Sequence, residues 1–170
     1  MVSNSVCTAS TEVANEFTVK LRPITQEDED FLYRVYVGTR EDITQLGWDD
    51  EQKEKFLRLQ FKAQHKQYKA QYCNAEFQII LLDENPVGRF YVNRTGDEIR
   101  IVDIALLPEF RGKGIGSTLL NQVLTEGKQK KLPVRIHVQQ SNPAFHLYQR
   151  LGFQKINETG VYFLMERISN

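Results

Sequence analysis

Cysteine is scarce in this sequence of 170 residues, which contains only Cys7 and Cys73. Two cysteines without a paired spacing exclude a metal site of four thiolates and a disulfide framework, and they favour a reducing compartment. No apolar run reaches the roughly 18 residues of a membrane-spanning helix. Residues 1–16 lack the basic start and the apolar stretch of a secretory signal. We therefore expect a cytoplasmic protein that has no membrane partner.

A net charge is absent as well, because 22 Lys and Arg balance 22 Asp and Glu. A neutral chain lacks the charge excess of a general polyanion binder, so we expect no nucleic-acid partner. The charges are nevertheless uneven: residues 26–51 hold nine acids and two bases, whereas residues 108–155 hold eight bases and two acids. Such runs are usually solvated helix faces. The functional alternative is an anion site in the C-terminal half and a surface for cations in the N-terminal half.

The rest of the composition, 41% hydrophobic and 26% charged residues, is typical of a globular protein. A chain of this length is expected to form one domain that buries about 70% of the surface of the unfolded chain. Residues 1–16 are small and polar. We therefore expect a flexible leader over residues 1–16 and a single domain over residues 17–170.

The hydrophobic period alternates between that of strands and that of helices. Strands are expected at 17–22, 77–82, 87–92, 99–107, 134–138, 153–156 and 161–166, and helices at 25–38, 49 to about 70, 112–131 and 143–151. In the second helix, Phe56, Leu59 and Ala63 are expected to face the core. This order predicts an α+β fold, a mixed sheet with helices on both faces, and a parallel β-α-β unit over residues 99–138.

The turn before the third helix is the most informative stretch, because Gly112, Gly114 and Gly116 fall within five residues. Each glycine weakens a helix by roughly 1 kcal/mol relative to alanine, so their presence suggests that a ligand approaches the backbone there. The first N–H groups of a helix are unpaired and lie at the positive end of its dipole, where phosphates bind. Arg111 and Lys113 add positive side chains. The alternative is a tight turn that needs glycine for packing alone.

Two common phosphate-binding motifs do not fit this turn. A P-loop requires Ser or Thr after Gly-Lys, but Gly112-Lys113 is followed by Gly114. A Rossmann fingerprint starting at Gly112 has Ser117 in place of its last glycine, and an antiparallel meander before the turn does not suit a doubly wound sheet.

Two blocks of the chain resemble motifs of the GCN5-related N-acetyltransferase (GNAT) family. The pattern Arg111-x-x-Gly114-x-Gly116, behind a strand ending at Leu106, is similar to the acyl-CoA pyrophosphate motif. The block from Asn142 to Phe153 is similar to the C-terminal signature, and the order of elements matches over almost the whole chain. The resemblance implies a GNAT-type fold with a central mixed sheet of about seven strands. It also implies an acetyl-CoA-dependent N-acetyltransferase that moves an acetyl group to a primary amine by direct attack, without a metal.

The same resemblance implies particular site residues. The backbone of Ile104 and Leu106 is expected to hold the pantetheine arm as an added strand would, where the strands near 104 and 135 part, and the Leu106 N–H is expected to stabilise the developing oxyanion. Tyr148 is implied as the general acid for the leaving thiolate, with a structural place beside Phe153 as the alternative. The residues implied to bind acetyl-CoA are Ile104, Ala105, Leu106, Arg111, Gly112, Lys113, Gly114, Ile115, Gly116, Ser117 and Asn142.

The general base stays open between Glu98, Asp103 and water. Strand alternation places Glu98 and Arg100 on one face of the sheet and Asp103 on the other, unless a bulge intervenes. His137 and His146 are expected to face outward or to satisfy local bonds rather than to act in catalysis.

The acceptor is expected to be a small-molecule or peptide amine, bound by a monomer or a homodimer. Trp48, Tyr36 and the acids near them suit a cationic or aromatic amine, although packing at a helix start explains Trp48 equally well. A CoA-binding regulatory module without catalysis, transfer of another acyl group and O-acylation remain alternatives.

Overall fold

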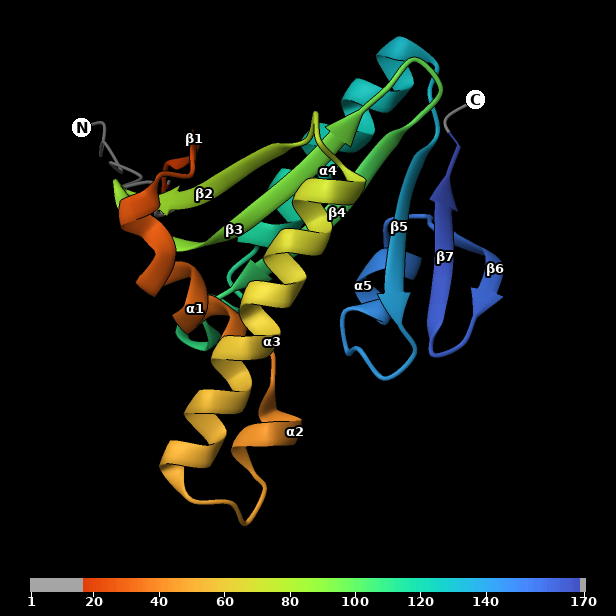
Figure 1. The fold of residues 1–170 in the computed structure, drawn as a ribbon. Helices are drawn as coiled ribbons and strands as arrows, with labels where there is room; N and C mark the ends of the chain where they lie inside the picture. The colour runs from red at the N-terminus through yellow and green to blue at the C-terminus, as the bar shows by residue number, and fades with distance from the viewer. Residues whose placement is uncertain (1–16, 169–170) are drawn as a thin grey trace, which may run out of the picture.

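The computed structural model describes residues 17–168, so the expected leader at 1–16 lies outside the described residues. In this part of the chain, seven strands form one mixed sheet, as the resemblance implies, and their order in the sheet is β1-β2-β3-β4-β5-β7-β6 (Figure 1). The strands are β1 (Val19–Pro23), β2 (Glu76–Leu82), β3 (Asn85–Arg94), β4 (Ile99–Leu106), β5 (Val134–Gln139), β6 (Gln154–Thr159) and β7 (Tyr162–Arg167).

Helices cover both faces of the sheet, which confirms the predicted layers (Figure 1). They are η1 (Gln26–Asp28), α1 (Glu29–Val37), α2 (Glu41–Thr44), α3 (Asp50–Gln71), η2 (Pro108–Phe110), α4 (Ile115–Lys130) and α5 (Phe145–Arg150). The sequence did not predict α2, because a single turn is too short to show a helical period. No helix between residues 17 and 168 is long and apolar enough to cross a membrane.

Two apolar cores lie on opposite faces of the sheet. Ile80 packs with Leu119 and Tyr148 on the face of α4 and α5, whereas Ile79 packs with Leu57 on the face of α1–α3. Neighbouring residues of β2 therefore enter different cores, which confirms that this apolar run is a strand covered on both sides.

The apolar stripe predicted for α3 is right at Phe56, which is partly buried against the core, and wrong at Leu59 and Ala63. Leu57 and Phe61 are buried, whereas Leu59 is 65% exposed and Ala63 is also exposed. Both stripes have helical spacing, so only the neighbours of the helix decide which face is buried. The start of the helix is as predicted: the Asp49 carboxylate accepts a hydrogen bond from the Gln52 N–H at 2.8 Å.

The pairing of β4 with β5 is parallel, as predicted, but it is short. It spans only Ile99 to Ile101 on β4 and Val134 to Ile136 on β5, after which the strands part. β4 also contains a bulge, because Tyr91 of β3 faces Asp103 while the next residue faces Ile101. The extra residue brings Asp103 to the face that carries Arg100, so simple strand alternation does not hold here.

Candidate active site

The glycine turn leaves open space in front of the backbone. Gly112 and Gly114 have φ of 73° and 82°, a left-handed conformation that favours glycine. A Cβ on either residue meets nothing within 4 Å, and one on Gly116 meets only the Ile104 Cδ1 at 4.0 Å. Close packing against neighbouring atoms therefore does not explain the glycines, whereas the left-handed turn itself accounts for Gly112 and Gly114 and leaves the space in front of them open. The helix begins at Ile115, so the predicted start at Gly112 is three residues too early.

The start of α4 presents unpaired N–H groups to this space. The first N–H bonded back to the cap is that of Thr118, which donates to the Gly114 carbonyl at 3.0 Å. Within residues 17–168, the N–H groups of Ile115, Gly116 and Ser117 have no backbone acceptor. The buried Ile115 side chain anchors the turn in the core. An open space with three free donors at a helix start fits a pyrophosphate.

The two cations beside the turn are placed differently. Arg111 donates from Nε to the Leu106 carbonyl at 3.1 Å and from Nη2 to the Gly38 carbonyl at 2.8 Å. It therefore joins the end of β4 to the residue that follows α1, and its guanidinium is directed at carbonyl groups. Lys113 is exposed, with Nζ 5.4 Å from the centroid of the Phe110 ring.

The end of β4 has a free edge towards β5. The Leu107 N–H donates to the Val87 carbonyl of β3 at 2.9 Å. Because N–H groups alternate in direction along a strand, those of Ile104 and Leu106 point to the opposite edge. Pairing with β5 has ended by there, so this edge is available to an extended ligand. Ala105 is buried between them against α1.

Tyr148 of α5 lies in the apolar core on the face of α4 and α5. Its side chain is 4% exposed, and its ring meets Phe153 edge-on at 5.8 Å between centroids. Burial, and then the charge of Asp103, raise the pKa of Tyr148 well above its ordinary value. Its hydroxyl has no hydrogen-bond partner in the part of the chain that the structure describes. Asn142 serves a local turn, since its Oδ1 accepts from the Ala144 N–H at 2.9 Å.

Asp103 lies under α3 in a buried polar cluster that the sequence analysis missed. Its Oδ2 accepts from the Arg89 Nη2 at 2.8 Å and from the Tyr68 hydroxyl at 2.9 Å. Among the described residues its Oδ1 accepts no hydrogen bond. Arg89 is 3% exposed and also donates to Gln64 at 2.8 Å. An arginine inside the apolar run of β3 was the available signal, because a buried cation requires an anionic partner.

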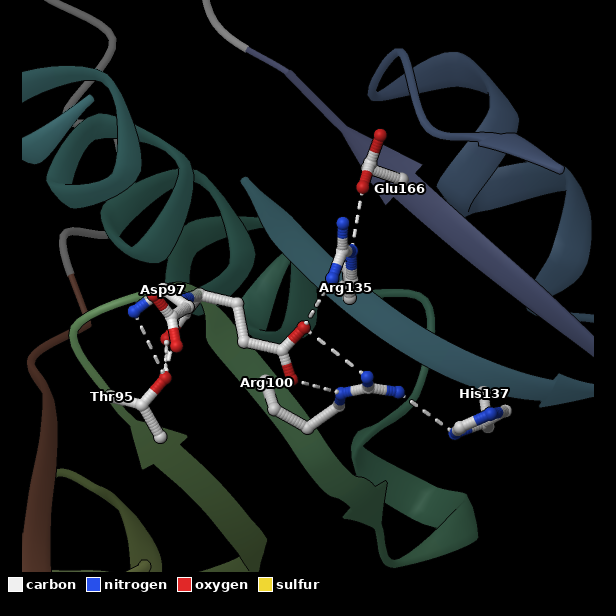
Figure 2. A network of polar contacts seen from close by, with 7 residues as sticks. Thr95, Asp97, Arg100, Arg135, His137 and Glu166 are labelled. Atoms are coloured by element: carbon white, nitrogen blue, oxygen red, sulfur yellow. Dashed lines mark hydrogen bonds and ion pairs between the residues drawn. The ribbon is translucent and has the colours of Figure 1, made fainter. Parts of the chain in front are cut away.

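Glu98, the other carboxylate considered as a base, is occupied on both oxygens. Arg100 donates from Nε to its Oε1 at 3.0 Å, and Arg135 donates from Nη1 to its Oε2 at 2.9 Å (Figure 2). Burial by itself raises the pKa of Glu98, but the two arginines together hold it below its ordinary value.

The aromatic residues expected to meet the acceptor differ in exposure. Tyr36 is 3% exposed, and its hydroxyl accepts from the Arg40 Nη1 at 2.7 Å, so it is a core residue. Trp48 is 42% exposed and meets Phe56 edge-on, with ring centroids 5.5 Å apart. Of these two residues, Trp48 is the one that a ligand can reach.

Comparison with known proteins places these features in one family. The family model described as the acetyltransferase (GNAT) family matches residues 22–153. A ribosomal protein bS18–alanine N-acetyltransferase from Haemophilus influenzae is 31% identical over 85 residues, which cover 49% of this chain and 58% of that protein. The chain thus aligns with a little over half of the length of this curated relative.

Solved structures share the fold. The PaiA N-acetyltransferase from Thermoplasma acidophilum, in complex with coenzyme A, has a TM-score of 0.67 and 22% identity over 89% of this chain and 99% of its own. An acetyltransferase from Thermus thermophilus has a TM-score of 0.65 and 19% identity over 89% of this chain and 97% of its own. With the glycine turn, the free edge of β4 and a family model that spans most of the chain, the protein belongs to the GNAT family of N-acetyltransferases.

Proposed function

We propose that this enzyme moves an acetyl group from acetyl-CoA to a primary amine by direct attack. The proposal rests on one observation: two backbone segments whose N–H groups lack partners lie close together. The free N–H groups at the start of α4 suit a pyrophosphate, and the free edge of β4 suits an amide-containing arm. Family membership supports this assignment, as does the name of the curated relative, which acts on an alanine of a ribosomal protein.

Backbone groups provide most of the proposed contacts to the cofactor. The N–H groups of Ile115, Gly116 and Ser117 bind the pyrophosphate, and Gly112 and Gly114 let it approach. The main chain of Ile104 and Leu106 holds the pantetheine arm. Arg111 positions the turn by binding the Leu106 carbonyl, and Lys113 adds a mobile positive charge near the phosphates.

We assign the proton acceptor to Asp103 rather than Glu98. Both oxygens of Glu98 accept hydrogen bonds from arginines, whereas Asp103 keeps its Oδ1 free. The charge of Asp103 also contributes to the raised pKa of Tyr148, so the two groups are close enough to interact although they belong to opposite faces of the sheet. Buried Arg89 keeps the Asp103 carboxylate in place through its Oδ2.

The reaction then needs one proton acceptor and one proton donor. Acetyl-CoA supplies a thioester, whose carbon–sulfur bond breaks as the carbon–nitrogen bond to the amine forms. Asp103 takes the proton from the amine nitrogen, directly or through a water. Tyr148, which is protonated at neutral pH, gives its proton to the leaving sulfur, and the Leu106 N–H stabilises the negative charge on the carbonyl oxygen. The products are an amide and free CoA, and solvent returns the proton from Asp103 to Tyr148.

A coupled thiol-release assay with a panel of amines tests the proposal. Tyr148→Phe and Asp103→Asn should each lower kcat by about 10²-fold, the low end for general acid–base catalysis. Binding of CoA, measured by calorimetry, should hardly change in either variant. Asp97→Asn is the matched control, because Asp97 is an exposed acid in the turn before β4.

Three results would contradict parts of the proposal. CoA binding without turnover of any amine would mean a binding module. Turnover of another acyl-CoA in preference to acetyl-CoA would mean a different donor. A Tyr148→Phe variant with lowered thermal stability and intact kcat would mean that Tyr148 only packs beside Phe153.

A further inference from the structure

The half of the sheet formed by β5, β7 and β6 has one face that no helix from the described residues covers (Figure 1). On the same face, charged side chains form a chain of contacts from the start of β4 across β5 to β7 (Figure 2). Arg135 of β5 donates to Glu166 of β7 at 2.6 Å and to Glu98 at 2.9 Å. Glu98 in turn accepts from Arg100 of β4, and Arg100 reaches His137 of β5. We call these five residues the charge ladder.

The ladder fixes the protonation of His137. The Arg100 Nη1 lies 3.0 Å from the His137 Nδ1. A guanidinium only donates hydrogen bonds, so Nδ1 is the acceptor and the ring proton is on Nε2. Burial and the charge of Arg100 lower the pKa of His137, which keeps the ring neutral. His137 therefore presents an N–H donor and has no free lone pair with which to act as a base.

Arg100 cannot readily turn away from the imidazole. Glu98 holds its Nε at 3.0 Å and its Nη2 at 3.3 Å, and the Arg100 side chain is only 12% exposed. The guanidinium is thus fixed in one orientation by a carboxylate, with its remaining nitrogen directed at His137. The tautomer of His137 follows from this fixed neighbour.

His137 lies at the opening between β4 and β5. It is the first residue of β5 after the last parallel pair, Ile101 with Ile136. On β4 the residues after Ile101 are Val102 and Asp103, and the bulge places Asp103 on the same face of the sheet as the ladder. The His137 side chain is exposed there. The opening is therefore flanked by a proton acceptor on β4 and a neutral N–H donor on β5.

We propose that His137 selects acceptors whose amine stands next to a carbonyl oxygen, as in the α-amino group of a peptide, by donating its Nε2–H to that oxygen. This inference rests on the proposed function and adds the acceptor class. The amine donates towards Asp103, so it offers no acceptor to the His137 N–H, which is exposed to water. When the substrate displaces that water, an oxygen beside the amine replaces the lost hydrogen bond. The two glutamates of the ladder balance its two arginines. A neutral carbonyl therefore suits this face better than a free carboxylate.

The test compares two acceptors that differ at the first amide bond: a short peptide with N-terminal alanine, and the same peptide with an (E)-alkene there. The alkene has neither the carbonyl oxygen nor the amide N–H, and the His137 variants identify which part of the difference depends on the oxygen. With the wild-type enzyme, kcat/KM should be about tenfold higher for the peptide, the size expected for one added hydrogen bond. In His137→Ala this ratio should fall to about one. His137→Gln, which keeps an N–H donor, should recover part of it, and His146→Ala is the matched control because His146 is exposed on α5.

A measurement without catalysis tests the same inference. The chain has three histidines, so ¹⁵N spectra of the imidazole rings can be assigned with one variant for each. The spectrum should show a neutral His137 ring with its proton on Nε2. A proton on Nδ1, or an acceptor ratio that is unchanged in His137→Ala, would overturn the inference. Equal turnover of both acceptors by the wild-type enzyme would overturn it while leaving the proposed function intact, whereas no turnover of any amine would overturn the proposed function.

Discussion

Two arginine–carboxylate systems lie on the same face of this sheet and differ in what covers them. Under α3, Arg89 is 3% exposed and binds Asp103. On the uncovered half, the Arg135 side chain is 34% exposed and binds Glu98 and Glu166. The buried pair is part of the core and holds the Asp103 carboxylate, the proton acceptor that we propose, in one position. The open ladder contributes little to stability, and its effect is to orient the side chains at its end.

The two arginine–carboxylate systems should differ most in how much each contributes to the free energy of unfolding. Arg89→Met leaves Asp103 without its cation in a buried site, and breaking such a pair lowers the free energy of unfolding by about 3–5 kcal/mol. Arg135→Met breaks contacts of a partly exposed ladder and should lower it by about 1 kcal/mol or less. Urea unfolding of both variants measures the difference. Equal losses would show that α3 does not change the environment of Asp103, and the double variant Arg89→Met/Asp103→Leu should regain part of the loss.

The ion pair of Arg22 with Asp28 should contribute an intermediate amount to the free energy of unfolding, and this amount should depend on pH. The Arg22 guanidinium, which donates to Asp28 at 2.7 and 2.8 Å, and the Thr25 N–H hold the pKa of Asp28 at about 2, against an ordinary value of 3.8. A lowered carboxylate pKa adds stability that is complete above about pH 4 and is lost as the pH falls through 2. With Arg22 36% exposed, we expect about 1–2 kcal/mol.

Arg22→Met should therefore unfold at lower urea than the wild type at pH 7, and the two curves should converge near pH 2. A difference that persists at pH 2 would mean that Arg22 stabilises the protein by packing instead of by charge.

At the proposed cofactor site, a substitution of Gly116 tests CoA binding with less risk to folding than a substitution of Gly112 or Gly114. Gly116 has no left-handed φ, and a Cβ there meets only Ile104 at 4.0 Å. Gly116→Glu should therefore fold normally but place an anion against the pyrophosphate, so the CoA affinity should fall more than tenfold, or over 1.4 kcal/mol. Calorimetry measures it, with Gly47→Glu, also at an open glycine, as control. Unchanged affinity in the folded variant would contradict the proposed cradle.

The smallest expected effect is that of the acids at the start of α3 on kcat/KM for the amine acceptor. α2 and the first turns of α3 project beyond the sheet at the end where β4 and β5 part (Figure 1). Changing Asp49, Asp50 and Glu51 to their amides should lower kcat/KM a few-fold for cationic amines at low salt and leave neutral amines unaffected. An Asn at position 49 still caps the helix. Parallel dependence of both amines on ionic strength would remove the electrostatic effect and leave these acids as helix caps.

Much of this architecture follows from local sequence. The continuous apolar run of β2 predicted a strand covered on both faces, and Ile79 and Ile80 do enter different cores. The turn after it, at Asp83 and Glu84, has positive φ at both residues, as a two-residue hairpin requires. Short-range patterns of this kind are determined by covalent geometry and by solvent, so they can be read from a few neighbouring residues.

The sequence by itself therefore determined the order of elements, the glycine turn with its free N–H groups, and the family. Only the tertiary structure decided which carboxylate keeps an oxygen without a hydrogen-bond partner among the described residues. A one-residue bulge in β4 turned Asp103 under α3 towards Arg89, and two arginines from β4 and β5 closed both oxygens of Glu98. The reason is that alternation along a strand is local, whereas a bulge and a charge partner depend on strands and helices far apart in the chain.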